Sequence, residues 1–178
     1  MDPFDVLGIE PTFDLGIELL EQRYRDLQRV LHPDRHVSEP PGVRRESLGR
    51  AVSVNEAFRV LRDELGRATA VLARLGVEVD EARQQPADPM FLMQVMELRE
   101  GLEEARTSSD MDRVQALRDR VEVDLSGVRA GLRSGFATLL SGGGESGLLE
   151  EMTDGVARLR YFHRFLEQVS DMEERILA

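Results

Sequence analysis

The sequence predicts an all-α protein in two parts, an N-terminal helical hairpin and a C-terminal bundle of three helices. Apolar residues recur at alternating steps of three and four along most of the chain, which is the period of helices that bury one side. Breaks in this period are few, and the clearest lie at Pro33 and at the glycine run 142–144. The 178 residues suffice for one or two domains, each with an apolar core.

The hairpin is predicted from two helices of similar length, over 15–31 and 43–64. Each carries a single apolar stripe, and two such helices pack most simply side by side in opposite directions. Pro33 lacks an N–H group and disfavours a helical backbone at His32, so the first helix should end there. The tip of the hairpin then carries His32, Pro33 and Asp34. The two stripes are Ile17, Leu20, Tyr24, Leu27 and Leu31, and Ala51, Val54, Phe58, Leu61 and Leu65.

Shorter elements flank the hairpin. Asp2, Pro3 and Gly8 are typical of the cap, first position and exit of a short helix over 3–8. A further helix is expected over 67–75. The segment 77–87 breaks the periodicity and indicates a domain junction. We therefore expect an N-terminal domain over 1–75, a linker over 76–87 and a C-terminal domain over 88–178.

The C-terminal domain should contain three long helices, over 88–106, 110–140 and 146–177. Asp88 is a helix cap followed by Pro89 at the first helical position, and Asp110 caps the next helix. The glycine-rich segment 141–147 cannot hold a helix and predicts a turn or loop. Long amphipathic helices with short joins are typical of a three-helix bundle.

The helix after Asp88 has more apolar residues than one side can bury. Phe91, Val95, Leu98 and Leu102 fall within about 60° of one another at 100° per residue and suffice as a core stripe. Leu92, Met93 and Met96 lie about 100–200° away from Phe91. On the last helix, Tyr161 and Phe165 likewise lie opposite the stripe of Met152, Val156 and Leu159. If these second faces adjoin, they form a partner-binding patch. The alternative is that their residues are core, packed either against the N-terminal domain or inside a thicker bundle.

Composition excludes several classes of function. The chain has no cysteine, which excludes disulfides and thiolate metal sites and is compatible with a reducing compartment. It has no lysine, which excludes a Schiff-base or phosphate-loop lysine. Of the net charge of −11, residues 77–178 carry −9 from 21 acidic residues and 12 arginines. This acidic half argues against nucleic acid and anionic lipid as partners. No apolar run approaches the ~20 residues that span a bilayer, and no secretory signal is visible.

A helical hairpin with His-Pro-Asp at its tip resembles the J domain of Hsp70 co-chaperones. The opening segment 2–8 resembles the first helix of a J domain, and 24–35 resembles the helix that ends in the tripeptide. The segment 88–100 is similar to the start of the C-terminal domain of the HscB family, the co-chaperones of iron–sulfur cluster assembly, and 156–167 resembles its last helix. The resemblance runs nearly from end to end of the chain.

The resemblance implies a co-chaperone with two partners and no catalytic activity or cofactor of its own. One partner is an HscA-type Hsp70, whose ATPase the chain stimulates and which binds His32, Pro33, Asp34, Arg25 and Arg29. The other is an IscU-like iron–sulfur scaffold protein, which contacts Leu92, Met93, Met96 and Tyr161. Asp34 would accept a charge-assisted hydrogen bond from a partner arginine, and the rigid proline would limit the entropy lost on docking. Cytoplasmic action is expected.

Alternatives to these assignments follow from the same residues. His32, Pro33 and Asp34 could simply form a turn that ends a helix. Arg25 and Arg29 could simply belong to a solvent-exposed helix surface. His32 and His36 are spaced like a zinc half-site, but Pro33 prevents them from sharing a regular helix. His163 on the last helix admits a histidine phosphotransfer module, although a packed histidine is the simpler interpretation. A J-domain co-chaperone with a different client is the remaining alternative.

Overall fold

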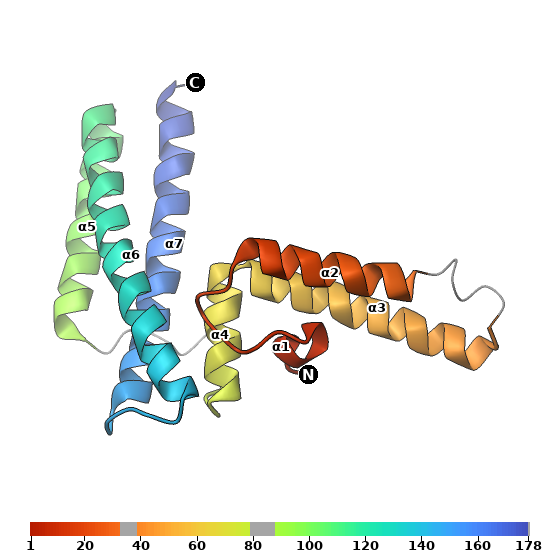
Figure 1. The fold of residues 1–178 in the computed structure, drawn as a ribbon. Helices are drawn as coiled ribbons and strands as arrows, with labels where there is room; N and C mark the ends of the chain where they lie inside the picture. Colours follow the sequence, from red (N-terminus) through yellow and green to blue (C-terminus); the bar gives the residue numbers. More distant parts are fainter. Residues whose placement is uncertain (33–38, 79–87, 178) are drawn as a thin grey trace. The chain divides into compact units, whose positions relative to one another are not determined.

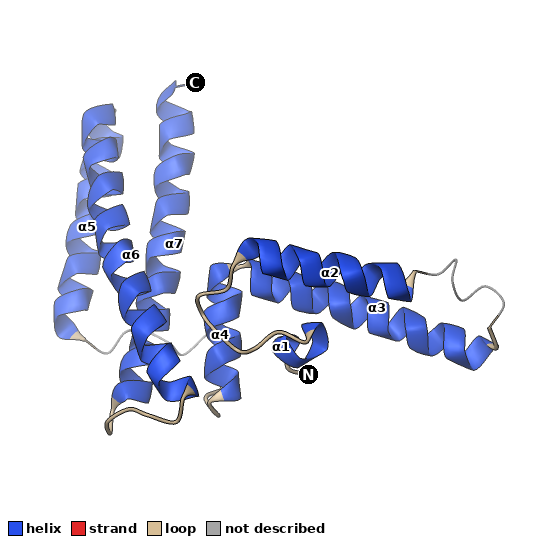
Figure 2. Ribbon diagram, viewed as in Figure 1, coloured by secondary structure: helices blue, strands red, loops and turns tan. Residues whose placement is uncertain are grey.

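The computed structural model describes residues 1–32, 39–78 and 88–177, and every regular element among them is a helix (Figures 1 and 2). The all-α prediction is therefore confirmed. The helices are α1 (Pro3–Leu7), α2 (Ile17–Leu31), α3 (Pro41–Arg62), α4 (Glu64–Arg74), α5 (Pro89–Ser108), α6 (Met111–Leu140) and α7 (Leu148–Leu177). The chain divides into two compact units, Met1–Val79 with Phe136–Gly143, and Asp80–Gly135 with Gly144–Ala178.

In the first unit α1 begins and ends as its residues predict. The Asp2 carboxylate accepts a hydrogen bond from the backbone N–H of Phe4 at 2.9 Å, and Pro3 takes the first helical position. Gly8 ends the helix in the left-handed conformation at φ 61°, which a residue without a side chain adopts readily. Arg74 of α4 pairs with Asp2 and, at 3.0 Å, with Asp5, so the N-terminal helix is tied to α4.

The α2–α3 hairpin packs along the predicted stripes. Leu20, Val54 and Leu61 are fully or almost fully buried. The ring of Tyr24 stacks on Phe58 with centroids 4.2 Å apart, and its hydroxyl donates to the Asn55 Oδ1 atom at 3.0 Å. These contacts join the first half of α2, as far as Tyr24, to the second half of α3.

The predicted stripe of α2 is wrong at its first residue. Ile17, the first residue of α2, is 45% exposed, whereas Leu20 in the same turn is fully buried. The predicted limits of α3 are wrong as well. The helix begins two residues earlier, at Pro41, and ends at Arg62, so Leu65 belongs to α4.

Asp63 causes the break between α3 and α4. Its backbone is extended at φ −75° and ψ 130°, and its side chain accepts a hydrogen bond from the Gly66 N–H at 2.6 Å. The single residue therefore ends one helix and caps the next. Arg67, one turn on, donates to the carbonyls of Phe13 at 2.9 Å and Leu61 at 2.7 Å. Burial lowers the pKa of its guanidinium group.

The second unit contains α5, α6 as far as Gly135, and α7, which lie side by side as three long helices (Figure 1). The predicted caps are present: Asp88 accepts from the Met90 N–H at 2.9 Å and Asp110 accepts from the Arg113 N–H at 3.0 Å. The glycine-rich segment 141–147 forms the turn between α6 and α7 as predicted. Each helix contributes to the core, which includes Phe91, Leu98, Leu102, Val114, Val121, Leu125, Leu132, Met152, Val156, Leu159, Phe162, Phe165 and Val169.

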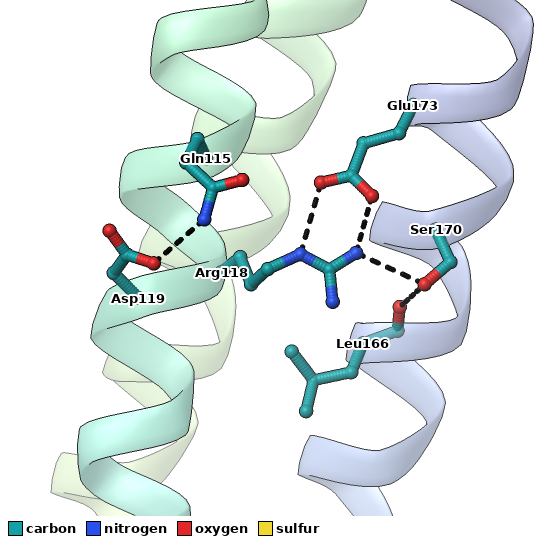
Figure 3. Close-up of polar contacts among 6 residues, drawn as sticks. All are labelled: Gln115, Arg118, Asp119, Leu166, Ser170 and Glu173. Carbon is teal, nitrogen blue, oxygen red and sulfur yellow. Dashed lines mark hydrogen bonds and ion pairs between the residues drawn. The ribbon is translucent and has the colours of Figure 1, made fainter.

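A polar contact joins α6 and α7 beside this core (Figure 3). The Arg118 guanidinium group forms a two-pronged ion pair with Glu173, with its Nε atom 3.0 Å from the carboxylate. It also donates to the Ser170 hydroxyl at 3.1 Å, which in turn donates to the Leu166 carbonyl at 3.0 Å. Both charged side chains are less than a quarter exposed. Paired arginine–carboxylate bonds of this kind fix orientation as well as distance, so they hold the two helices in register.

Candidate functional site

The first predicted site lies where α2 ends. The last helical residue is Leu31, and His32 follows with φ −57° and ψ 131°, outside the helical region, so the predicted end of this helix is confirmed. The His32 side chain is exposed. Pro33, Asp34 and His36 lie outside the described residues.

Arg25 and Arg29 lie on α2, one to two turns before this point. Both side chains are well exposed, and each has a carboxylate neighbour on its own helix: Glu21 lies 3.3 Å from Arg25 and Asp26 lies 3.6 Å from Arg29. Exposed pairs of this type are worth ~0.3–0.5 kcal/mol, so a partner carboxylate can replace them at little cost. Their role in binding stays a prediction.

The second predicted site lies on α5. Four large apolar side chains project from its first two turns into solvent, and we call them the α5 patch. Their exposures contrast with those of Phe91 and Leu98, which are 3% and 0% exposed on the core side of the same helix. The α5 patch consists of Met90 at 72%, Leu92 at 42%, Met93 at 58% and Met96 at 70%.

The exposure of Leu92, Met93 and Met96 agrees with the helix angles worked out from the sequence. Met90 was missed there, although it lies three residues before Met93 just as Met93 lies three before Met96. That repeated spacing was the available signal, because steps of three carry a side chain around the helix by about 60°.

Tyr161 and Phe165 do not both belong to a second, solvent-facing side of α7. Phe165 is 2% exposed and is part of the core, so for this residue the thicker core, one of the two interpretations left open, is confirmed. The reason is that two helices pack against α7. The second of them, α5, covers the apolar side chains of α7 that lie outside the stripe of Met152, Val156 and Leu159. Tyr161 is half-buried at the edge of an aromatic cluster, with its ring 5.6 Å from Phe91 and 6.3 Å from Phe165.

The phenol of Tyr161 reaches the same helix that carries the α5 patch. Its hydroxyl donates to the Val95 carbonyl at 3.4 Å, next to Met96 in the chain. Burial raises the pKa of this phenol, an effect that the nearby Arg99 partly offsets. Tyr161 therefore packs against α5 from α7 and exposes only part of its side chain to solvent.

A shallow depression of about 400 Å³ borders the α5 patch on the side of α6. Arg158 of α7 anchors it: its guanidinium group donates to Asp88 at 2.8 Å and lies 5.2 Å from the centre of the Phe91 ring. Asp88 thus caps α5 with one oxygen and holds Arg158 with the other. Two further contacts join α5 to α6 here, from Gln94 to Asp124 at 2.5 Å and from Arg120 to Glu97 at 3.2 Å.

Beyond the α5 patch the exposed side of α5 becomes acidic. Glu100, Glu103 and Glu104 are all exposed, and the last two pair with Arg106 and Arg113 respectively. The exposed surface of this helix is therefore apolar over its first half and rich in carboxylates over its second half. Such a surface suits a protein partner that presents apolar side chains beside basic ones.

The remaining candidates give no third site. His163 is half-buried in α7. Within residues 1–32, 39–78 and 88–177, no group of three or more histidine, aspartate or glutamate side chains is arranged to hold a metal ion. Across these same ranges, no helix is both long and apolar enough to cross a membrane.

Comparisons with known proteins agree on one family. Residues 87–170 match the family described as the HSCB C-terminal oligomerisation domain. A co-chaperone protein HscB homolog from Shewanella baltica is 33% identical over 178 residues, which cover 99% of each chain.

Two solved structures share the fold. The chaperone HscB from Vibrio cholerae superimposes with a TM-score of 0.79 at 27% identity, over 99% of both chains. The human co-chaperone protein HscB superimposes with a TM-score of 0.80 at 24% identity, over 96% of this chain and 81% of the human one. From the match in sequence along its whole length, the chain belongs to the HscB family of co-chaperones.

Proposed function

We propose that the chain binds an IscU-like iron–sulfur scaffold protein, delivers it to an HscA-type Hsp70 and stimulates the ATPase of that Hsp70, and so aids the assembly or transfer of iron–sulfur clusters. The observation that carries the proposal is the α5 patch, three methionines and a leucine exposed on one helix. Contiguous exposed apolar side chains are typical of protein-binding surfaces, and methionine adapts its shape to a partner.

In this proposal the two partners bind different parts of the chain. Residues 1–75 form the J domain, 76–87 the linker and 88–178 the scaffold-binding domain. His32, Pro33 and Asp34 contact the Hsp70, and Arg25 and Arg29 add favourable electrostatics that salt should weaken. Leu92, Met93, Met96 and the exposed part of Tyr161 contact the scaffold, and Tyr161 also supports the helix that carries the other three. The absence of cysteine is compatible with the reducing cytoplasm.

The chain acts by bringing two proteins together. Once the scaffold is held by the α5 patch and the Hsp70 by the J domain, the encounter between scaffold and Hsp70 takes place within one complex at a high effective concentration. ATP hydrolysis takes place on the Hsp70. Stimulation requires that docking favours the hydrolysis-competent state of the Hsp70, because a ligand shifts only an equilibrium whose states it binds unequally.

The test separates the two partners. His32→Gln or Asp34→Asn should abolish stimulation of the Hsp70 ATPase in a single-turnover assay and leave the affinity for the scaffold unchanged by calorimetry. His163→Gln is the matched control, and it should leave both readings unchanged. A folded Asp34→Asn protein that stimulates like the unmodified chain would contradict the proposal, and so would an unmodified chain that binds no scaffold.

A further inference from the structure

The sulfur atoms of this protein are unevenly exposed. The chain has seven methionines and no cysteine or tryptophan, so methionine is its most readily oxidised side chain. Met90, Met93 and Met96 are 72%, 58% and 70% exposed, whereas Met152 is 3% exposed. Exposure controls how easily an oxidant reaches a thioether, so oxidation should be concentrated on α5 and on Met1 at the N-terminus, which is 99% exposed.

Three of the four exposed methionines, Met90, Met93 and Met96, also lie together. They follow one another at steps of three on α5 and make up three of the four side chains of the α5 patch. Met152 is protected by close packing, because its sulfur lies where a side chain on Gly135 would be, 2.2 Å from the ideal Cβ position. Met111 and Met172 are half-buried elsewhere in the second unit.

We propose that Met90, Met93 and Met96 form an oxidation-sensitive site through which peroxides weaken binding of the scaffold protein. The inference rests on the proposed function of the α5 patch. In each step the thioether sulfur attacks one peroxide oxygen, the O–O bond breaks and an S–O bond forms. The sulfur loses two electrons and becomes a sulfoxide, and the peroxide is reduced to water. Methionine sulfoxide reductases reverse the change.

Oxidation would remove the property that makes this surface bind. A sulfoxide is a polar group with a strong acceptor oxygen, and an apolar partner would have to desolvate it without a matching donor. Three sulfoxides would leave Leu92 as the one apolar member of the α5 patch. The fold itself should be unaffected, because all three side chains already lie mostly in solvent.

The first experiment measures where oxygen is added. The full chain is treated with hydrogen peroxide, and each methionine-containing peptide is followed by mass spectrometry. We expect Met90, Met93 and Met96 to react at least about tenfold faster than Met152, in line with their access to solvent. Equal rates at Met152 and on α5 would overturn the inference whether or not the chain binds a scaffold.

The second experiment measures binding of the scaffold before and after oxidation. We expect an increase of about tenfold or more in Kd, equivalent to about 1.4 kcal/mol, an unchanged circular dichroism melting curve, and recovery after treatment with methionine sulfoxide reductases of both stereospecificities. A Met90→Leu, Met93→Leu, Met96→Leu variant has an apolar surface that peroxide cannot oxidise, so its own affinity for the scaffold, whatever its value, should be the same before and after peroxide. The control Met111→Leu, Met172→Leu should remain as sensitive as the unmodified chain.

The outcomes distinguish the two proposals. If the reduced chain binds the scaffold and the triply oxidised chain binds it equally well, the inference fails while the proposed function stands. If the triple leucine variant still loses affinity after peroxide, another residue is responsible and the inference again fails. If the reduced chain does not bind the scaffold at all, the proposed function fails and the regulatory inference fails with it.

Discussion

Truncating the α5 patch should separate binding from stability. The double substitution Leu92→Ala with Met96→Ala removes side chains that are 42% and 70% exposed, which together present about as much surface as one whole side chain. Full burial of such a side chain in an interface contributes ~2–3 kcal/mol, so the scaffold should bind about 2 kcal/mol more weakly, or about thirtyfold in Kd. The loss of folding stability should stay below about 1 kcal/mol, compared with ~2–5 kcal/mol for truncation of a fully buried leucine or methionine.

The assay pairs isothermal titration of the scaffold with thermal unfolding of the same preparation. A matched control is Leu48→Ala with Val52→Ala on α3, where the side chains are 60% and 61% exposed. The control should change neither the scaffold affinity nor the melting temperature appreciably. A large fall in melting temperature for Leu92→Ala with Met96→Ala would refute the reasoning, because it would mean that these residues stabilise the fold. Equal loss of affinity in the control would refute the location of the site.

Two further predictions concern the fold around the site. Gly131→Ala, with open space at its Cβ position, should raise the free energy of unfolding, measured by denaturant titration, by up to about 1 kcal/mol. Gly135→Ala on the same helix should lower it by ~1–3 kcal/mol, because the new methyl group meets Met152. Equal effects of the two substitutions would contradict the packing. The phenol of Tyr161 should ionise above the ordinary value of about 10 when phenolate absorbance is followed. Since the folded chain then holds this proton more tightly than the unfolded chain, stability is complete below that value and falls as the pH rises towards the folded pKa, and Tyr161→Phe should abolish this part of the fall.

The sequence was most informative where one residue controls the backbone. Asp2, Asp88 and Asp110 each begin a helix where a capping side chain was predicted, and the glycine-rich segment 141–147 lies between two helices. Helix caps and glycine-rich turns depend only on residues that are adjacent in the sequence, so they can be recognised without knowing the fold. The break at Asp63 is of the same kind, but it was predicted at 65–66, because apolar spacing continues across Asp63 from Leu61 to Leu65.

The sequence was least informative about which apolar residues are covered. A single stripe explains a helix with one neighbour, but α7 buries Val156, Phe162, Phe165 and Val169 on a wider arc because two other helices pack on it. Tyr161 is half-buried for the same reason, although its position on the helix, opposite the core stripe, predicted an exposed side chain. The exposure of Leu92, Met93 and Met96 was predictable because α5 has more apolar residues than one side of a helix can bury.

The junction at Asp63 also makes the first unit sensitive to chain length. Because Asp63 is the single residue between α3 and α4, the direction in which α4 leaves α3 depends on the backbone of that one residue. Inserting a residue at this point would move α4 relative to α3 and disturb the packing of Ala68, Val71 and Leu72, all wholly inaccessible to water. The unit therefore tolerates changes of residue type at this corner far better than an added residue, and homologous proteins should vary in length elsewhere.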